Sequence, residues 1–244
     1  VYKRQEQDCV ISLSKMKTHA LERITGAVKN SYGFIYGFHK AKGHTQYPSA
    51  DSFARMLIDL NKCVAPKLYV MDGIVAMEGN GPGSGDPVPM NVLLMSTDPV
   101  ALDSVFSRLV YLKPEMVPTN YHGEKMGLGT WKEEEITLLT PDGEISMAEA
   151  VKKYGNPAFN VDRTEVRKNI WTRMAGALNI FQKKPYIEAD KCVRCGICVQ
   201  SCPVPGKAVD FRKGKGKPPV YDYRKCIRCF CCQEMCPKKA IKVK

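Results

Sequence analysis

The 244-residue sequence has no long hydrophobic run. No stretch approaches the roughly 18 consecutive apolar residues that a membrane-spanning helix needs, so we expect no membrane span. No charged and then apolar leader stands at the start of the chain either. The chain opens with VYKRQEQ rather than methionine, and we expect its true N-terminus to be missing. A cytoplasmic location is therefore the expectation, with an export signal left open.

Two phosphate-binding motifs are also absent. The glycine-rich stretch DGIVAMEGNGPGSGDP, residues 72–87, contains no G-x-G-x-x-G in frame and no Gly-Lys-Ser/Thr. These absences exclude the dinucleotide-binding fingerprint and the P-loop. Two interpretations of the glycines stay open, a flexible loop and a backbone cradle that binds a small anion.

Cysteine and net basic charge are scarce in the first part of the chain and concentrated in the last part. Nine of the eleven cysteines follow residue 190. Residues 183–244 hold 16 Lys and Arg against 5 Asp and Glu, a net charge of +11, whereas residues 1–182 have a net charge of +1. Two compositions in one chain predict two domains, 1–182 and 183–244, with a break near Gln182.

The cysteines form a repeat. CVRCGICVQSCP starts at Cys192 and CIRCFCCQEMCP starts at Cys226, and both contain Cys-x2-Cys-x2-Cys-x3-Cys-Pro. This run is typical of bacterial ferredoxins with two [4Fe–4S] clusters, in which three cysteines of a run bind one cluster and the fourth binds the other. The repeat therefore predicts two [4Fe–4S] clusters with the ligand sets Cys192, Cys195, Cys198 and Cys236, and Cys226, Cys229, Cys232 and Cys202.

Disulfides and zinc are the alternatives for such a cysteine-rich segment. Cysteines two and three residues apart rarely reach disulfide geometry. A zinc ion needs only two Cys-x2-Cys pairs, which leaves the third cysteine and the Cys-Pro end of each run unexplained. Both alternatives are disfavoured.

Cys231 lies outside the frame of the repeat. We expect a small, partly buried apolar side chain, because free cysteine usually packs in that way. An alternative cluster ligand and a redox-sensitive thiol stay open.

The basic charge of residues 183–244 predicts docking of an acidic redox partner protein by electrostatic steering. Nucleic acid is another partner for a basic surface. It is disfavoured here, because the sequence has no zinc-finger pattern, no RNA-recognition signature and no ladder of aromatic residues.

Residues 8–182 alternate strand-like and helix-like stretches. We expect strands at 9–17, 67–77 and 90–99, and helices at 19–37, 51–64, 99–112 and 163–181. This alternation predicts an α/β layered domain with a largely parallel sheet, truncated at its N-terminus. Short strands around the cysteine runs predict a small α+β, ferredoxin-like second domain.

Several polar residues of the first domain follow or end predicted strands. Ligands in open α/β sheets bind at the carboxyl ends of the strands, so these residues are candidates for catalysis or for binding a small anionic ligand. The candidates are Lys15, Lys17, His19, Asp72, Asp98 and Asp103.

Some of these residues have structural roles as alternatives. Asp98 precedes Pro99 and is expected to cap the helix that follows, with Asp103 joining it in a polar site. His19 is a capping or core histidine, or a group that binds an anion or moves protons. His39 and His44 are expected at the surface, without a third ligand for a metal.

Four stretches of the first domain are KMKTH, TGAVKNSYG, DGIVAMEGNGPGSG and STDPVALD. With them the chain resembles the family called domain of unknown function 362, over residues 8–112 and the ferredoxin part. The resemblance implies an iron–sulfur protein of anaerobic bacteria or archaea, with a further N-terminal portion that adds strands to the same sheet. It implies no particular substrate.

The sequence as a whole predicts an iron–sulfur protein that transfers electrons, with an α/β domain that docks a partner or a small anionic ligand. Two other functions stay open. One is an oxidoreductase that reduces an unknown organic substrate in the α/β domain, and the other is an iron–sulfur sensor or assembly protein.

Overall fold

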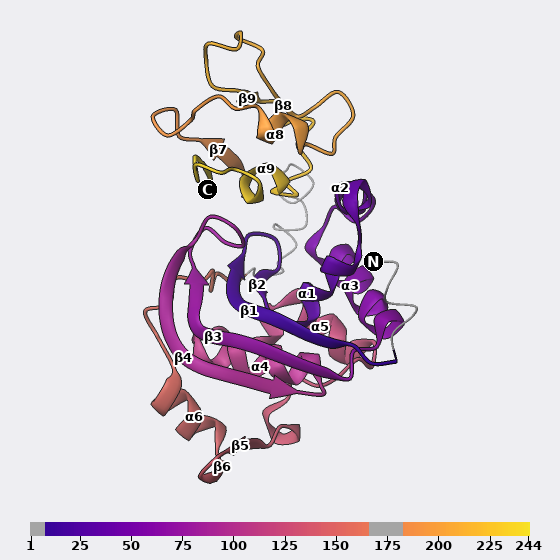
Figure 1. Ribbon diagram of the computed structural model, residues 1–244, viewed down its shortest axis with the longest axis vertical. Coiled ribbons are helices and arrows are strands. Elements are labelled where there is room, and N and C mark those ends of the chain that lie inside the picture. Colours follow the sequence, from indigo (N-terminus) through magenta and orange to yellow (C-terminus); the bar gives the residue numbers. More distant parts are fainter. Residues whose placement is uncertain (1–7, 166–182) are drawn as a thin grey trace. The chain divides into compact units, whose positions relative to one another are not determined.

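The computed structural model describes residues 8–165 and 183–244 (Figure 1). The chain divides into two compact units, Val1–Asp162 and Arg163–Lys244. Most of the helix expected at 163–181, and the expected break near Gln182, lie outside the described residues.

The first unit is built on a four-stranded sheet. Its strands are β1 (Ile11–His19), β2 (Arg23–Thr25), β3 (Leu68–Glu78) and β4 (Asp86–Ser96), in the order β2-β1-β3-β4. The α/β class is confirmed. The sheet is mixed, because β1 and β3 pair in parallel while β2 and β4 pair antiparallel to their neighbours. A short glycine-rich loop joins β3 to β4, and only a longer crossover would have allowed a parallel pair.

The helix expected at 19–37 does not form, and this prediction is wrong. Its residues instead form the end of β1, the strand β2, the helix α1 (Ala27–Asn30) and the 3-10 helix η2 (Ser31–Phe34). The glycines at positions 26, 33 and 37 weaken a continuous helix. Pairing of β2 with the end of β1 then decides the local structure.

The other expected helices of the first unit are confirmed. Helix α3 (Ala50–Val64) begins with a capping box formed by Ser49 and Ser52, and helix α4 (Pro99–Leu109) begins after Asp98. Figure 1 shows α1, α4 and α5 (Pro118–Lys125) on one side of the sheet. The main core lies between the sheet and α4, where Met16, Met71 and Phe106 are fully buried.

His44 was expected at the surface, and this prediction is wrong. Helix α2 (Gly37–Gln46) packs so that His44 is buried and stacks on Phe53 with 4.6 Å between the ring centroids. Burial of this ring between aromatic side chains could not be foreseen from the polar sequence around it. The His39 side chain lies outside the described part.

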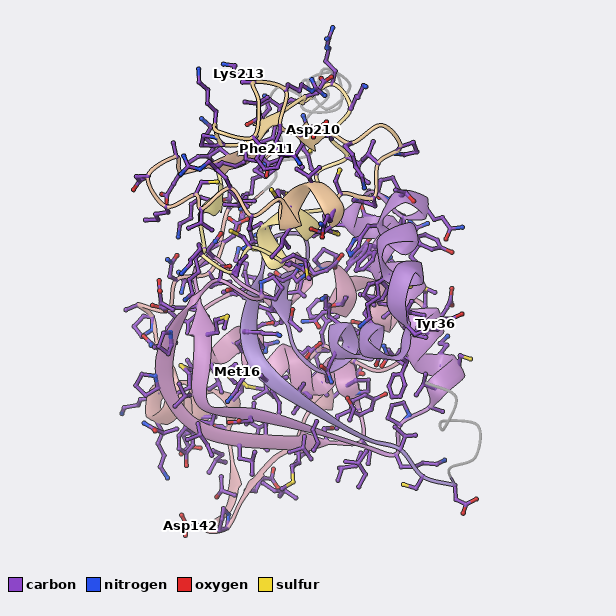
Figure 2. The ribbon with its side chains drawn as sticks, turned by 45° about the horizontal axis from the view of Figure 1, so that its top comes forward. Met16, Tyr36, Asp142, Asp210, Phe211 and Lys213 are labelled. Carbon is purple, nitrogen blue, oxygen red and sulfur yellow. The ribbon has the colours of Figure 1, made fainter. Side chains whose placement is uncertain are left out.

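The remaining elements of the first unit follow α4. They are η3 (Pro114–Met116), η4 (Glu133–Glu135), the hairpin of β5 (Leu138–Thr140) and β6 (Gly143–Ile145), and helix α6 (Met147–Tyr154). Asp142 lies in the exposed turn of this hairpin (Figure 2). Phe159 is buried in the core and packs edge-on against Phe106, with 6.3 Å between the ring centroids.

The second unit contains two matched halves, as the ferredoxin-like prediction requires. Strand β7 (Pro185–Ile187) pairs with β10 (Ile241–Val243), and β8 (Val209–Asp210) pairs with β9 (Val220–Tyr221). Each cysteine run contains a one-turn helix, α8 (Ile197–Gln200) or α9 (Cys231–Glu234). Within residues 8–165 and 183–244, no helix has the length and apolar character to cross a membrane.

Candidate metal centres and the polar end of the sheet

In its described part, the second unit has two cavities that are each lined by four cysteines. The structure brings together the same two sets that the spacing of the repeat groups as ligands. Cys192, Cys195, Cys198 and Cys236 line the first cavity, and Cys202, Cys226, Cys229 and Cys232 line the second.

The backbone of each run bends around its cavity in the same way. Residues two and four positions after the first cysteine have a positive φ in both runs: Arg194, Gly196, Arg228 and Phe230. A left-handed backbone is uncommon outside glycine, so its recurrence at matched positions indicates a constrained loop. The three closely spaced cysteines of each run line the same cavity.

The fourth cysteine of each run accepts a backbone hydrogen bond. Ala208 N–H donates to Cys202 Sγ and Ala240 N–H donates to Cys236 Sγ, both over 3.3 Å. Such donors stabilise negative charge on a sulfur. The two bonds are equivalent in the two halves of the unit.

The donor set fits iron–sulfur clusters. All eight cysteines have free thiols, and four of them are buried. Burial raises the pKa of the Cys198 thiol to about 11 and that of the Cys232 thiol to about 12. Positive iron ions would offset this cost of holding thiolates away from water.

The zinc alternative gains no support from this arrangement. Among the described residues, no three side chains of His, Cys, Asp or Glu converge closely enough to hold a metal ion between them. Zinc needs four ligands at about 2.0–2.3 Å, whereas a four-iron cluster spreads its thiolates around a larger body.

Cys231 lines neither of these cavities. Its thiol is half-buried next to Cys229, and the interaction with Cys229 together with burial raises the pKa of Cys231.

Replacement of Cys231 by alanine should leave the iron and sulfide content of the anaerobically purified protein unchanged. The reason is that all eight cavity cysteines remain. Chemical iron and sulfide determination on both proteins checks this, and loss of iron from the variant would make Cys231 a ligand.

The polar residues of the first unit do not meet in one site. Lys15 and Asp72 form an ion pair of 2.5 Å on the face of the sheet turned away from the helices, where both side chains are more than two-fifths exposed. The hydrogen bond from Lys15 lowers the pKa of Asp72, which also accepts from Ile74 N. An exposed ion pair of this kind contributes about 0–1 kcal/mol to stability.

His19 caps a turn. It is buried, and its Nδ1 accepts hydrogen bonds from the backbone N–H groups of Leu21 and Glu22, each over 3.1 Å. The structural role left open by the sequence is therefore the one the geometry favours. Lys17 stands two residues earlier on β1, in register with Thr25 on β2.

Asp98 caps helix α4, as predicted. One carboxylate oxygen accepts from Val100 N and Ala101 N over 2.7 and 2.9 Å, and the other accepts from Thr130 N over 2.9 Å. Asp98 therefore fixes the start of α4 and holds the chain near residue 130 against it.

Asp103 is fully buried and holds a different part of the chain. Its carboxylate accepts from Ala27 N over 2.6 Å and from Val28 N over 3.1 Å. Burial raises the pKa of Asp103 to about 7, although these two hydrogen bonds oppose the shift. A Cβ at residue 26 would lie 1.9 Å from Asp103 Oδ1, so Gly26 permits this approach. Asp98 and Asp103 therefore do not share the polar site that was expected. Each carboxylate instead accepts hydrogen bonds from backbone N–H groups of a different segment.

The glycine-rich loop is a packed turn. Gly79 has φ +70°, and its carbonyl accepts from Thr18 Oγ1 over 3.1 Å. A Cβ at Gly81 would lie 2.2 Å from the Thr18 carbonyl oxygen. The N–H groups of both glycines donate to backbone carbonyls of the chain itself. These two N–H groups are therefore already bonded within the chain and do not support the interpretation of the loop as a cradle for an anion.

Two side chains were missed by sequence reasoning. Glu22 is fully buried, neither carboxylate oxygen has a hydrogen-bond donor among the described residues, and burial raises its pKa well above the usual value. The sequence predicted a helix over residues 19–37, and this wrong prediction gave no reason to single out residue 22. Tyr221 donates its hydroxyl hydrogen to Cys232 Sγ over 3.1 Å. Its place five residues before Cys226 was the available signal.

Comparisons with known proteins agree with this architecture. Residues 3–108 match the family described as domain of unknown function (DUF362). Residues 184–237 match the family described as 4Fe-4S dicluster domain. Both parts of the resemblance seen in the sequence are confirmed, and the second unit is similar to iron–sulfur domains.

A curated relative is the thylakoid-associated protein sll1697 of Synechocystis sp. It is 41% identical over 124 residues, which are 50% of this chain and 39% of the relative. The match thus spans about two-fifths of the relative's length. The anaerobic source implied by the resemblance stays a prediction.

Proposed function

We propose that the chain is an electron-transfer protein that carries two [4Fe–4S] clusters, one in each cysteine-lined cavity. The observation that carries this proposal is the division of eight cysteines between two matched cavities. The match of residues 184–237 to the 4Fe-4S dicluster domain supports it. Each cluster, when bound, accepts and releases one electron at a time.

The protein's own residues have separate tasks in this function. The cysteine thiolates bind the irons, and the N–H groups of Ala208 and Ala240 stabilise charge on two of the sulfurs. Apolar side chains such as Ile241 and Val209 pack around the cysteines and limit water near them. Lower polarity and fewer waters affect the reduction potential of such a centre.

The partner is proposed to be an acidic redox protein. The second unit has a net charge of +11 over residues 183–244, and exposed bases such as Arg212, Lys213 and Lys215 lie in the loop between β8 and β9. Figure 2 labels Lys213 in this loop. A basic surface attracts an acidic protein and raises the association rate, and salt weakens that attraction. A cytoplasmic location for this exchange stays a prediction.

The first unit is proposed to dock a partner or a small anionic ligand. Among the described candidates, Lys15, His19, Asp98 and Asp103 are each bonded to another group of the chain. A substrate-binding centre built from them gains no support, so electron transfer is favoured over reduction of an organic substrate.

An anaerobic inventory tests the proposed function. Full-length protein is reconstituted with iron and sulfide, and its iron, sulfide, other metals and bound small molecules are counted. We expect about eight irons and eight sulfides per chain. Dithionite reduction followed by mixing with an acidic acceptor ferredoxin should then oxidise the clusters at a rate that falls with added salt. An iron count of four or fewer, or clusters that cannot be reduced, would contradict the proposal.

A further inference from the structure

The two cysteine-lined cavities can be compared residue by residue, because equivalent backbone hydrogen bonds lie beside each of them. Glu188 N–H donates to the Ala240 carbonyl in one half, and Asp222 N–H donates to the Ala208 carbonyl in the other. Residues 188 and 222 both stand four positions before the first cysteine of a run. This equivalence fixes the alignment of the strands that precede the two runs.

The next residue toward the N-terminus breaks the match. It is Ile187 on β7 in the first half and Tyr221 on β9 in the second, and each lines its own cavity. Tyr221 donates a hydrogen bond to Cys232 Sγ over 3.1 Å. Cys232 is the third cysteine of its run, and its equivalent in the other half is Cys198. Isoleucine has no hydrogen-bond donor in its side chain, so Ile187 cannot supply the corresponding bond.

The Tyr221 ring is held in place from one side. It stacks on Tyr223, with 5.6 Å between the centroids and 14° between the planes. The hydroxyl of Tyr223 donates to the Pro185 carbonyl over 2.9 Å. The donor is therefore fixed against the sulfur by packing, and the bond does not depend on an exposed, freely rotating side chain.

We propose that Tyr221 raises the reduction potential of the cluster held by Cys202, Cys226, Cys229 and Cys232, and so separates the potentials of the two clusters. Reduction adds negative charge to the cluster, and a hydrogen bond to a ligand sulfur stabilises the more negative state. The inference rests on the proposed electron-transfer function. It follows that an electron entering the protein resides mainly on this cluster, because the cluster with the higher reduction potential is reduced first.

Nearby charges do not supply an equivalent effect in the other half. Arg194 and Lys238 border the first cavity, but both residues are exposed to solvent. Water and salt screen the field of exposed charges, whereas a direct hydrogen bond to a sulfur is not screened in this way.

The test is a redox titration of the full chain, reconstituted anaerobically and followed by electron paramagnetic resonance. In Tyr221→Phe, the reduced-to-oxidised ratio of one cluster at a fixed solution potential should fall about ten-fold, which equals about 59 mV for a one-electron couple. The other cluster should not change. Loss of one hydroxyl keeps the ring and its packing, so iron and sulfide content should stay the same.

Tyr223→Phe is the matched control, because it removes the hydroxyl of the other ring of the stacked pair, and that hydroxyl bonds to a backbone carbonyl rather than to a sulfur. It should shift neither cluster by as much as Tyr221→Phe does. Fully loaded Tyr221→Phe protein with unchanged potentials, or with both clusters shifted equally, would overturn the inference and leave the proposed function intact. Wild-type protein that takes up no clusters would overturn both.

Discussion

Replacement of Cys198 by serine should remove one cluster, so that iron falls from about eight to about four per chain. Cys198 is buried in the core of the second unit, beside Val209 and Ile241. Loss of a cluster removes its binding energy from the folding of this small unit, because metal binding and folding are coupled. We therefore also expect the unit to become more sensitive to protease.

Cys63→Ser is the control for this experiment. Cys63 is an exposed thiol on α3 of the first unit and belongs to neither cavity. Its replacement should leave iron, sulfide and protease resistance as they are in the wild-type protein. Retention of all the iron by Cys198→Ser protein would show that the ligand assignment is wrong.

Replacement of Asp103 by alanine should destabilise the first unit by about 3 kcal/mol. The change leaves the N–H groups of Ala27 and Val28 without their acceptor in a buried place. It also removes the hydrogen bonds that join α4 to the segment that follows β2. Urea unfolding of wild type and variant measures the difference in the free energy of unfolding.

Asp142→Ala is the matched control, because Asp142 is exposed in the turn between β5 and β6. Its effect should stay within about 0.5 kcal/mol, as is usual for surface substitutions. An equal effect of the two alanine variants would contradict the role assigned to Asp103.

The effect of Asp103 should also depend on pH. The carboxyl has a pKa of about 7 in the folded protein, against about 3.9 in an unfolded chain. Between these values the folded state binds the extra proton, so this contribution to stability is complete below pH 4 and is lost as the pH rises through 7. Its upper limit is about 4 kcal/mol. Asp103→Asn should remove this pH-dependent part, and an unchanged pH profile would show that Asp103 does not titrate as described.

The sequence by itself determined the features whose geometry is local. The spacing of the cysteines grouped them into two sets of four, the same sets that line the two cavities. Asp98 before Pro99 predicted the start of α4, because a capping residue acts on N–H groups two and three positions away. Helix α3 followed from the spacing of its apolar residues.

The tertiary structure decided the features that join distant parts of the chain. The stretch 19–37 is helix-like in pattern, but pairing of β2 with β1 and the clamp from Asp103 to Ala27 give it a different structure. The side chain that reaches Cys232 is Tyr221, eleven residues away, while Ile187 occupies the equivalent place in the other half. Sequence spacing fixes which atoms are near along the backbone, whereas hydrogen bonds and burial between separate elements depend on how those elements pack.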